Sequence, residues 1–383
     1  MPALILFSDT ERSPAMRHEV PLAIGDPFLF VEQDGRTAIL TSSLDRDRIA
    51  AVHPDAELLD FLAFGFRELA QERPRAEAQQ IVIARVLNHL GVRDAVVPWD
   101  FPVALADALR ADGVTVTVDE ALFAARRRVK AGAELDGIRA AQAAADAAMA
   151  VASDLLRGAS PDRAGWLTRP DGERLLAERV RDVLRRACAE HGATCPADMI
   201  VASVHNGYGH DPGSGPLPAG LPIEVDLFPR HEATGCWADM TRTFVVGTPT
   251  TEHAALIAEQ ERLVRAALEQ TRAAVRPGVT GLELHGAACA LFEQAGYATQ
   301  RTAPSGEREG FQFALGHGVG LEVHEPPGVG LSGREPFIAG DVIAVEPGLW
   351  DERIGGVRFE DLLLVTSDGC ETLTRFPYEL TPS

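Results

Sequence analysis

The sequence predicts a two-domain protein: an α/β domain over residues 1–124, then an α+β domain over residues 125–383 in which helices cover a curved antiparallel sheet. The first observation is length, because 383 residues exceed one ordinary domain. The second is the alternation of strand and helix patterns in the first third of the chain. The third is the glycine-punctuated strands of roughly the last hundred residues, which follow several helical patterns.

The N-terminal third opens with a hairpin signal. Two apolar runs, 28–31 and 37–40, flank Asp34-Gly35, a dipeptide typical of a two-residue β-turn. The other expected elements follow in alternation: a helix over 78–90, a strand over 94–97, a helix over 104–109 and a strand over 114–118. We find no phosphate-binding glycine loop in this part, which by itself predicts no function.

A domain boundary is expected near the basic run Arg126–Arg128, which we interpret as the solvated start of a helix. An alanine-rich helix should follow over 133–156, ended by Gly158 and Pro161. Further helical patterns cover residues 172–191, 251–274 and 282–295.

Composition excludes several classes of function. The net charge of −20 argues against a nucleic acid or an anionic membrane surface as partner. We see neither a signal peptide nor a transmembrane segment, because the longest apolar runs are short. The five cysteines are scattered and never spaced as CxxC, which disfavours a disulfide framework or a thiolate zinc site and favours a cytoplasmic location.

Four acidic residues stand in otherwise apolar strand patterns: Asp226, Asp239, Glu346 and Glu360. Burying such acids is costly unless they are paired, hydrogen-bonded or bound to a metal. Asp226 and Asp239 are 13 residues apart and Glu346 and Glu360 are 14 apart, each pair across a turn-rich connection, so two hairpins can bring all four together. Four ionised carboxylates need cations between them, which predicts one or two divalent metals, Mn²⁺ or Co²⁺ by ligand type. The alternative is that each acid forms a structural ion pair with an arginine.

Histidines supply the next candidates. His317 and His324 lie seven residues apart in a glycine-rich stretch, where glycines allow the backbone to approach an imidazole closely. One would serve as a fifth metal ligand and the other as a hydrogen-bond partner for a substrate, or either is simply a satisfied polar residue. His210 lies in a loop 16 residues before Asp226, and nothing local assigns a role to nearby His205.

At these residues the sequence resembles a known family. The sequence is similar to the signatures of the pita-bread metallopeptidases in several segments. These are the segments around Asp226 and Asp239-Met240-Thr241-Arg242-Thr243, then Gly316-His317-Gly318-Val319-Gly320, His324-Glu325-Pro326-Pro327, Glu346-Pro347-Gly348 and Arg358-Phe359-Glu360-Asp361. The His-Glu-Pro-Pro and Glu-Pro-Gly segments are most similar to the Xaa-Pro peptidases, prolidase and aminopeptidase P. The resemblance covers the C-terminal two thirds, which would be the pita-bread catalytic domain. The N-terminal third matches a creatinase-like domain in size and α/β character only.

The resemblance implies a site and a chemistry. Five residues would ligate two divalent ions, with Asp239 and Glu360 bridging: Asp226, Asp239, His317, Glu346 and Glu360. Glu346 would also act as general base, His210 and His324 would hold the substrate and its tetrahedral intermediate, and Arg358 would orient carboxylates. The ions would be Mn²⁺, with Co²⁺ or Zn²⁺ possible, the substrate a small peptide with proline second, and the protein a homodimer. Thr241, two residues from Asp239 on a strand, should face the same side and could hydrogen-bond a ligand carboxylate.

The sequence also departs from the family pattern. Phe228 stands where the family usually has glycine, Cys236 stands where a tyrosine is expected, and the loop 227–238 is longer than usual. Phe228, Arg230 and Trp237 are therefore candidates for shaping the substrate pocket, or they merely pack the longer hairpin.

The favoured function is an Xaa-Pro dipeptidase, which must bind the free carboxylate of proline. The nearest alternative is aminopeptidase P, whose site stays open beyond the proline. A metal-free creatinase-type hydrolase and a non-enzymatic pita-bread binding module both predict lost ligands, and all five ligand positions are kept.

Overall fold

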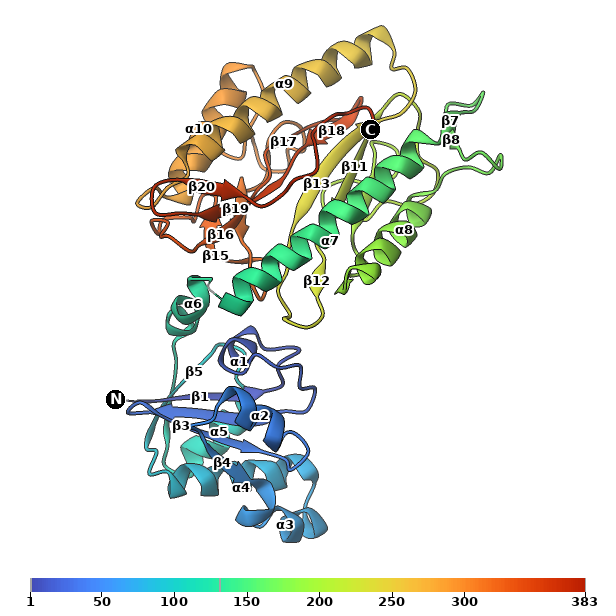
Figure 1. Ribbon diagram of the computed structural model, residues 1–383. Helices are drawn as coiled ribbons and strands as arrows, with labels where there is room; N and C mark the ends of the chain where they lie inside the picture. The colour runs from blue at the N-terminus through green and yellow to red at the C-terminus, as the bar shows by residue number, and fades with distance from the viewer. Residues whose placement is uncertain (1, 131, 383) are drawn as a thin grey trace. The chain divides into compact units, whose positions relative to one another are not determined.

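The computed structural model describes residues 2–130 and 132–382 of the chain (Figure 1). The chain forms two compact units: Met1–Arg127 with Ala233–Gly235, and Arg128–Glu232 with Cys236–Ser383. We call them unit 1 and unit 2. Within the described residues, no helix combines the length and apolar character needed to cross a membrane.

Unit 1 is built on a mixed sheet with strand order β4-β3-β2-β1-β5-β6. Its strands are β1 (Ala3–Ser8), β2 (Phe28–Gln33), β3 (Arg36–Thr41), β4 (Glu57–Asp60), β5 (Asp94–Val97) and β6 (Thr115–Val118). The predicted turn joins β2 to β3, where Asp34 and Gly35 both have positive φ, 51° and 75°. This conformation suits a two-residue hairpin loop, so the predicted hairpin is confirmed.

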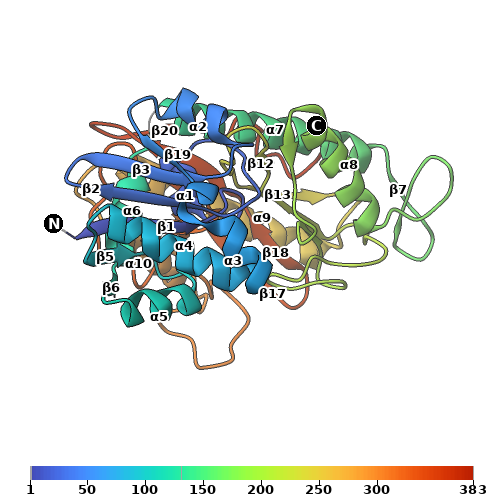
Figure 2. The same ribbon diagram turned by 90° about the horizontal axis from the view of Figure 1, so that it is seen from below.

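Helices cover both faces of this sheet, which makes unit 1 an α/β layer structure as predicted. They are α1 (Pro14–Glu19), α2 (Arg46–Val52), α3 (Phe66–Glu72), α4 (Arg75–His89), α5 (Val103–Ala111) and α6 (Glu120–Arg128), with a 3-10 turn at Phe61–Phe64. Alternate residues of β1 separate the two cores: Ile5 packs with α4 and α5, whereas Leu4 and Leu6 pack with α1 and α2. Figure 2 shows α3 and α4 on the near side of the strands when unit 1 is seen from below.

Unit 2 contains two helix-covered sheets, the predicted α+β architecture. The first consists of β10 (Ile200–Ala202), β11 (Pro222–Leu227) and β13 (Met240–Val245). The alanine-rich helix α7 (Gly132–Arg157) and α8 (Ala177–Glu190) pack against it through small apolar side chains such as Ala148 and Ala152. Short strands flank this layer: β7 (Ser160–Pro161), β8 (Leu167–Thr168), β9 (Ala193–Thr194) and β12 (Arg230–His231).

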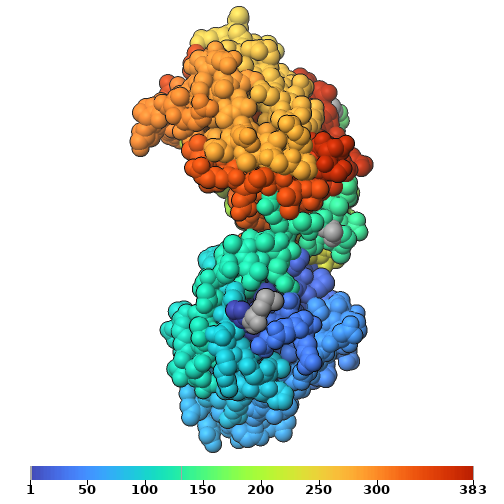
Figure 3. Space-filling view, turned by 90° about the vertical axis from the view of Figure 1, so that its left-hand side faces the viewer, coloured from blue at the N-terminus to red at the C-terminus, as the bar shows by residue number. Residues whose placement is uncertain are grey.

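The second sheet of unit 2 has the order β15-β14-β16-β19-β20. Its strands are β14 (Gly316–Gly318), β15 (Glu325–Val329), β16 (Val342–Val345), β19 (Asp361–Val365) and β20 (Cys370–Thr372), and a hairpin, β17 (Gly348–Asp351) with β18 (Gly355–Arg358), connects β16 to β19. Helices α9 (Thr251–Ala274) and α10 (Gly281–Gln294) pack on it. Figure 3 shows these helices, yellow to orange, forming much of the visible surface of unit 2.

The prediction for the basic run is wrong. The run Arg126–Arg128 is not the solvated start of a helix, because it ends α6 and its side chains are engaged. The Arg126 guanidinium binds both Glu19 and Glu32, and Arg128 binds Asp341 at 2.8 and 2.9 Å. These partners lie far away in the sequence, so a local pattern could not show them.

Candidate metal centre

Two antiparallel strands bring the first two acids together. Asp226 lies near the end of β11, opposite Thr241 of β13. Asp239 directly precedes β13, two residues before Thr241, so both project to the face on which Asp226 lies. The pairing of the two strands thus places two carboxylates side by side.

The second pair of acids is placed in the same way. Glu346 directly follows β16 and Glu360 directly precedes β19, and these strands pair antiparallel with Val345 opposite Asp361. The apolar surroundings of Glu360 predicted a position inside one continuous strand. The structure instead places Glu360 at a break between β18 and β19. Its backbone N–H donates to Thr241 O at 3.1 Å, which joins the two sheets at the site.

The structure brings the five predicted ligand residues into one cluster. One potential ligand atom from each of Asp226, Asp239 and Glu360 lies within 4.8 Å of the others. The same holds for His317, Glu346 and Glu360. Glu360 belongs to both groups, so its carboxylate joins them into one cluster.

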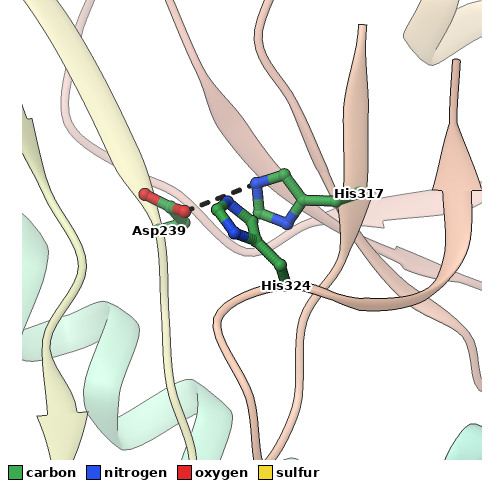
Figure 4. A group of neighbouring side chains, drawn as sticks. All are labelled: Asp239, His317 and His324. Carbon is green, nitrogen blue, oxygen red and sulfur yellow. Dashed lines mark ion pairs between the residues drawn. The ribbon is translucent and has the colours of Figure 1, made fainter. Parts of the chain in front are cut away.

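The histidines close this cluster from the other side. His317 lies on β14, and its Nε2 is 3.6 Å from Asp239 Oδ2 and 3.7 Å from Glu346 Oε1. His324 stacks edge-on against His317 with ring centroids 4.1 Å apart. Figure 4 shows both imidazoles directed towards Asp239, and the three residues form a further group of potential ligands.

Electrostatics show the cost of assembling these groups. Burial, together with the charges of Glu360 and Asp226, raises the pKa of Asp239 well above its usual range. Burial and the charges of Glu346 and Asp226 do the same to the pKa of Glu360. Burial raises the pKa of Glu346 to about 7 and lowers the pKa of His317 to about 3.

The donor set fits divalent cations. Asp226 Oδ1 is buried and accepts no hydrogen bond from any described residue. Clustered carboxylates with a neutral imidazole are ligands for ions such as Mn²⁺ or Co²⁺, whose charge would offset the mutual repulsion. Within the described residues, neither Asp239 nor Glu360 forms an ion pair with an arginine, so structural arginine pairing does not account for the cluster.

Two neighbours hold the carboxylates in place. Thr241 Oγ1 donates to Glu360 Oε2 at 2.7 Å, which confirms the contact expected from its position on the strand. Arg358 Nη2 donates to Asp226 Oδ2 and pairs with Glu224 at 2.9 Å, and its Nη1 is 3.5 Å from Glu346. Sequence reasoning assigned no role to Glu224, although its position two residues before Asp226 on a strand would have placed both on one face.

A cavity of about 390 Å³ opens on this cluster. His210, His317, His324, Glu346 and Arg358 line it, and they also line a smaller cavity that reaches the carboxylates. The apolar wall of the larger cavity includes Tyr208, Pro222, Phe313, Leu349, Trp350 and Val357. Tyr208, Phe313 and Trp350 come from separate loops and strands and were not predicted.

Of the remaining candidate residues, only some lie at the cavities. Phe228 lines the smaller cavity beside Asp226. Trp237 instead supports a neighbouring loop, donating from Nε1 to Leu321 O at 3.2 Å. Arg230 lies on β12 and His205 stacks on Trp166 with ring centroids 6.2 Å apart, and neither is among the described residues that line the two cavities.

With this geometry in view, the comparison with known families is informative. Residues 136–367 match the model of metallopeptidase family M24. The match spans the first sheet, all of the second sheet except β20, and every residue of the carboxylate cluster. The chain belongs to metallopeptidase family M24, and its architecture is the pita-bread fold expected from the resemblance.

The chain is similar to several individual peptidases of this family. The Xaa-Pro dipeptidase of Pyrococcus horikoshii is 34% identical over 220 residues, 56% of each chain, so this match spans only about half the length of that relative. The probable dipeptidase PepE of Mycobacterium bovis is 31% identical over 306 residues, 78% of this chain and 72% of the relative. The structure of an Xaa-Pro dipeptidase from Bacillus anthracis superposes with a TM-score of 0.78 at 22% identity, covering 99% of this chain and 94% of that one, which shows a shared fold.

Proposed function

We propose that this protein hydrolyses the peptide bond preceding proline in Xaa-Pro dipeptides, using two divalent metal ions. The observation that carries the proposal is the buried cluster of Asp226, Asp239, His317, Glu346 and Glu360 at the base of an apolar cavity. The relatives named above are an Xaa-Pro dipeptidase and a probable dipeptidase, which favours this activity over that of an aminopeptidase.

The five residues of the cluster would hold the ions, with Asp239 and Glu360 shared between them. Bound divalent ions lower the pKa of water and polarise a carbonyl group. Glu346 lines the cavity next to the other carboxylates, which is where a general base must lie to take a proton from water. Because a prolyl amide nitrogen carries no hydrogen, Glu346 accepts the proton of the attacking water and delivers it to that nitrogen as the bond breaks.

The imidazoles act on the substrate rather than on the proton. His210 and His324 both line the cavity next to the carboxylates, where they can donate to the carbonyl oxygen as it gains negative charge. Arg358 stays paired with Asp226 and Glu224, and therefore orients carboxylates instead of binding substrate.

Arg308 is the candidate partner for the free carboxylate of a dipeptide. It lines the same cavity, and none of the ion pairs between described residues involves it. Its guanidinium lies 4.1 Å from the centroid of the Tyr208 ring, whose hydroxyl donates to Arg308 O at 3.0 Å. Tyr208 packs in turn on Trp350, so an aromatic stack holds the guanidinium at the cavity.

Several finer assignments belong to the same proposal. Mn²⁺ is the proposed ion because the ligands are mostly carboxylate oxygens. The resemblance to Xaa-Pro peptidases supports a homodimer and supports residues 1–124 as a creatinase-like domain beside a catalytic domain over 125–383. The scattered, unbridged cysteines of the described chain support a cytoplasmic location.

The test combines chelation with a substrate comparison. Purified protein treated with a strong chelator should lose hydrolysis of a Xaa-Pro dipeptide and regain it with Mn²⁺. A Xaa-Pro-Yaa tripeptide should turn over more slowly than the dipeptide, and a faster tripeptide would favour the aminopeptidase. Hydrolysis that survives chelation would refute the metal-dependent mechanism.

A further inference from the structure

A buried ion pair lies next to the segment that carries His324. Lys130 is the only lysine of the chain, and its Nζ contacts the carboxylate of Glu325. The two side chains are 1% and 2% exposed. Neither residue takes part in the chemistry described above, and both belong to unit 2.

Glu325 connects the two histidines of the site through the backbone. It directly follows His324 and begins β15, where it pairs with Gly318 of β14. Gly318 in turn directly follows His317. A displacement of Glu325 would therefore move the backbone of both histidines.

The ion pair also packs onto the connection between them. A Cβ atom at Gly320 would lie 2.5 Å from Glu325 Oε1 and 2.7 Å from Lys130 Cε, so a side chain at this position would have to displace the ion pair. The second carboxylate oxygen of Glu325 accepts from the Glu322 N–H at 3.4 Å, and the Gly320 N–H donates to Glu322 O at 3.0 Å. We call the segment 320–324 the histidine loop. The Glu325 side chain packs against Gly320 of this loop and accepts a hydrogen bond from its Glu322 N–H.

We propose that the Lys130–Glu325 ion pair is a positioning device that fixes the histidine loop and so holds His324 against the substrate. A buried charge cannot leave its partner without a large desolvation cost, so Lys130 restrains Glu325 more firmly than a surface ion pair would. The role assigned to His324 rests on the proposed peptidase function. The restraint on the loop does not, and it can be measured separately.

The informative variant removes both charges together. Removing one partner of a buried pair leaves an uncompensated charge and destabilises the fold, whereas removing both is often tolerated. We therefore choose Lys130→Met/Glu325→Gln, in which the introduced amide keeps an oxygen for the Glu322 N–H. The matched control is Arg128→Met/Asp341→Asn, which removes an ion pair from the same chain segment that does not contact the histidine loop.

Two measurements decide the matter. Hydrogen exchange should show faster exchange of the amides of residues 320–324 in the Lys130/Glu325 double variant than in the wild type or the control. Its kcat on a Xaa-Pro dipeptide should fall about 10–100-fold, the loss typical of a misplaced group, while KM and melting temperature stay close to those of the control.

Unchanged exchange and unchanged kcat in a folded double variant would overturn the positioning role. Equal losses in the double variant and the control would also overturn it, because the effect would then be general destabilisation. If the wild type hydrolyses no Xaa-Pro dipeptide, the proposed function fails, and the exchange rates alone decide whether the pair restrains the loop.

Discussion

The ion-free protein should become less stable as the pH rises, whereas the protein with bound divalent ions should become more stable. The reason is that burial and mutual repulsion raise the pKa of Asp239 and of Glu360 well above their usual range. In the unfolded chain both groups are ionised by about pH 6. The folded protein therefore binds more protons than the unfolded chain, and the free energy of unfolding falls with pH.

The magnitude follows from the number of protons retained. Each carboxyl that stays protonated only in the folded state contributes about 1.4 kcal/mol per pH unit. For a unit of this size, one such proton corresponds to a decrease in melting temperature of about 3–6 °C per pH unit. Glu346, with its pKa raised to about 7, adds to the decrease between its unfolded value and neutrality.

The histidines act in the opposite direction but in a different range. Burial, with the charge of His324, lowers the pKa of His317 to about 3, so the folded protein binds fewer protons there than the unfolded chain. This contribution increases stability as the pH rises and is complete above the unfolded value of about 6.5. Above that value His317 contributes no slope, and the carboxyl groups whose pKa is raised set the slope at this site.

The assay is thermal unfolding of chelated and Mn²⁺-loaded protein between pH 7 and 9. Loaded protein should gain stability with pH, because deprotonated carboxylates bind the ions. Asp239→Asn serves as control: it should raise the melting temperature of chelated protein at pH 9 while weakening Mn²⁺ binding. A melting temperature of chelated protein that is flat or rising over this range would refute the repulsion argument.

Three further variants test individual residues. Glu346→Gln should lower kcat by about 10²–10⁴-fold, as expected for the loss of a general base. Substrate binding that persists without turnover would support this role of Glu346, whereas full activity would contradict it. Arg308→Ala should raise KM for a Xaa-Pro dipeptide about tenfold, as expected for a lost charge-assisted contact, with no effect on the C-terminal amide of the same dipeptide; equal effects on both would exclude carboxylate recognition. Thr241→Val removes the hydrogen bond to Glu360 and should weaken Mn²⁺ binding by calorimetry about 10–100-fold, and unchanged affinity would show that the hydroxyl does not orient that carboxylate.

Local patterns predicted those parts of the molecule whose signals are themselves local. Helix α9 has the predicted bounds, Thr251–Ala274, because the Thr250 side chain caps its first turn and a helical pattern fills the rest. The acids were found for a similar reason, since a carboxylate such as Asp226 in an apolar strand is conspicuous wherever that strand lies. The convergence of the four acids could be inferred because each pair is separated by a similar number of residues across a turn-rich connection, as the two arms of a hairpin are.

What could not be predicted depends on contacts between distant segments. The partners of Arg126 and the pairing of Lys130 with Glu325 involve residues about a hundred or more positions away in the sequence, and no periodicity reports them. The cavity wall likewise combines Tyr208 with Trp350 from different elements. Glu224 is different, because strand alternation with Asp226 would have revealed its direction, although not its partner.

The two sheets explain why the acids stay together despite their repulsion. Asp226 and Glu360 are fixed by strands whose ladders continue into helix-covered cores, and the Thr241 hydroxyl and carbonyl tie Glu360 to the opposite sheet. Relaxing the carboxylates apart would require breaking those ladders, whereas protonation removes the charge of a carboxylate without moving the strands. Protons therefore compete directly with divalent ions for the site, and its affinity for ions must rise with pH until the carboxylates are fully ionised.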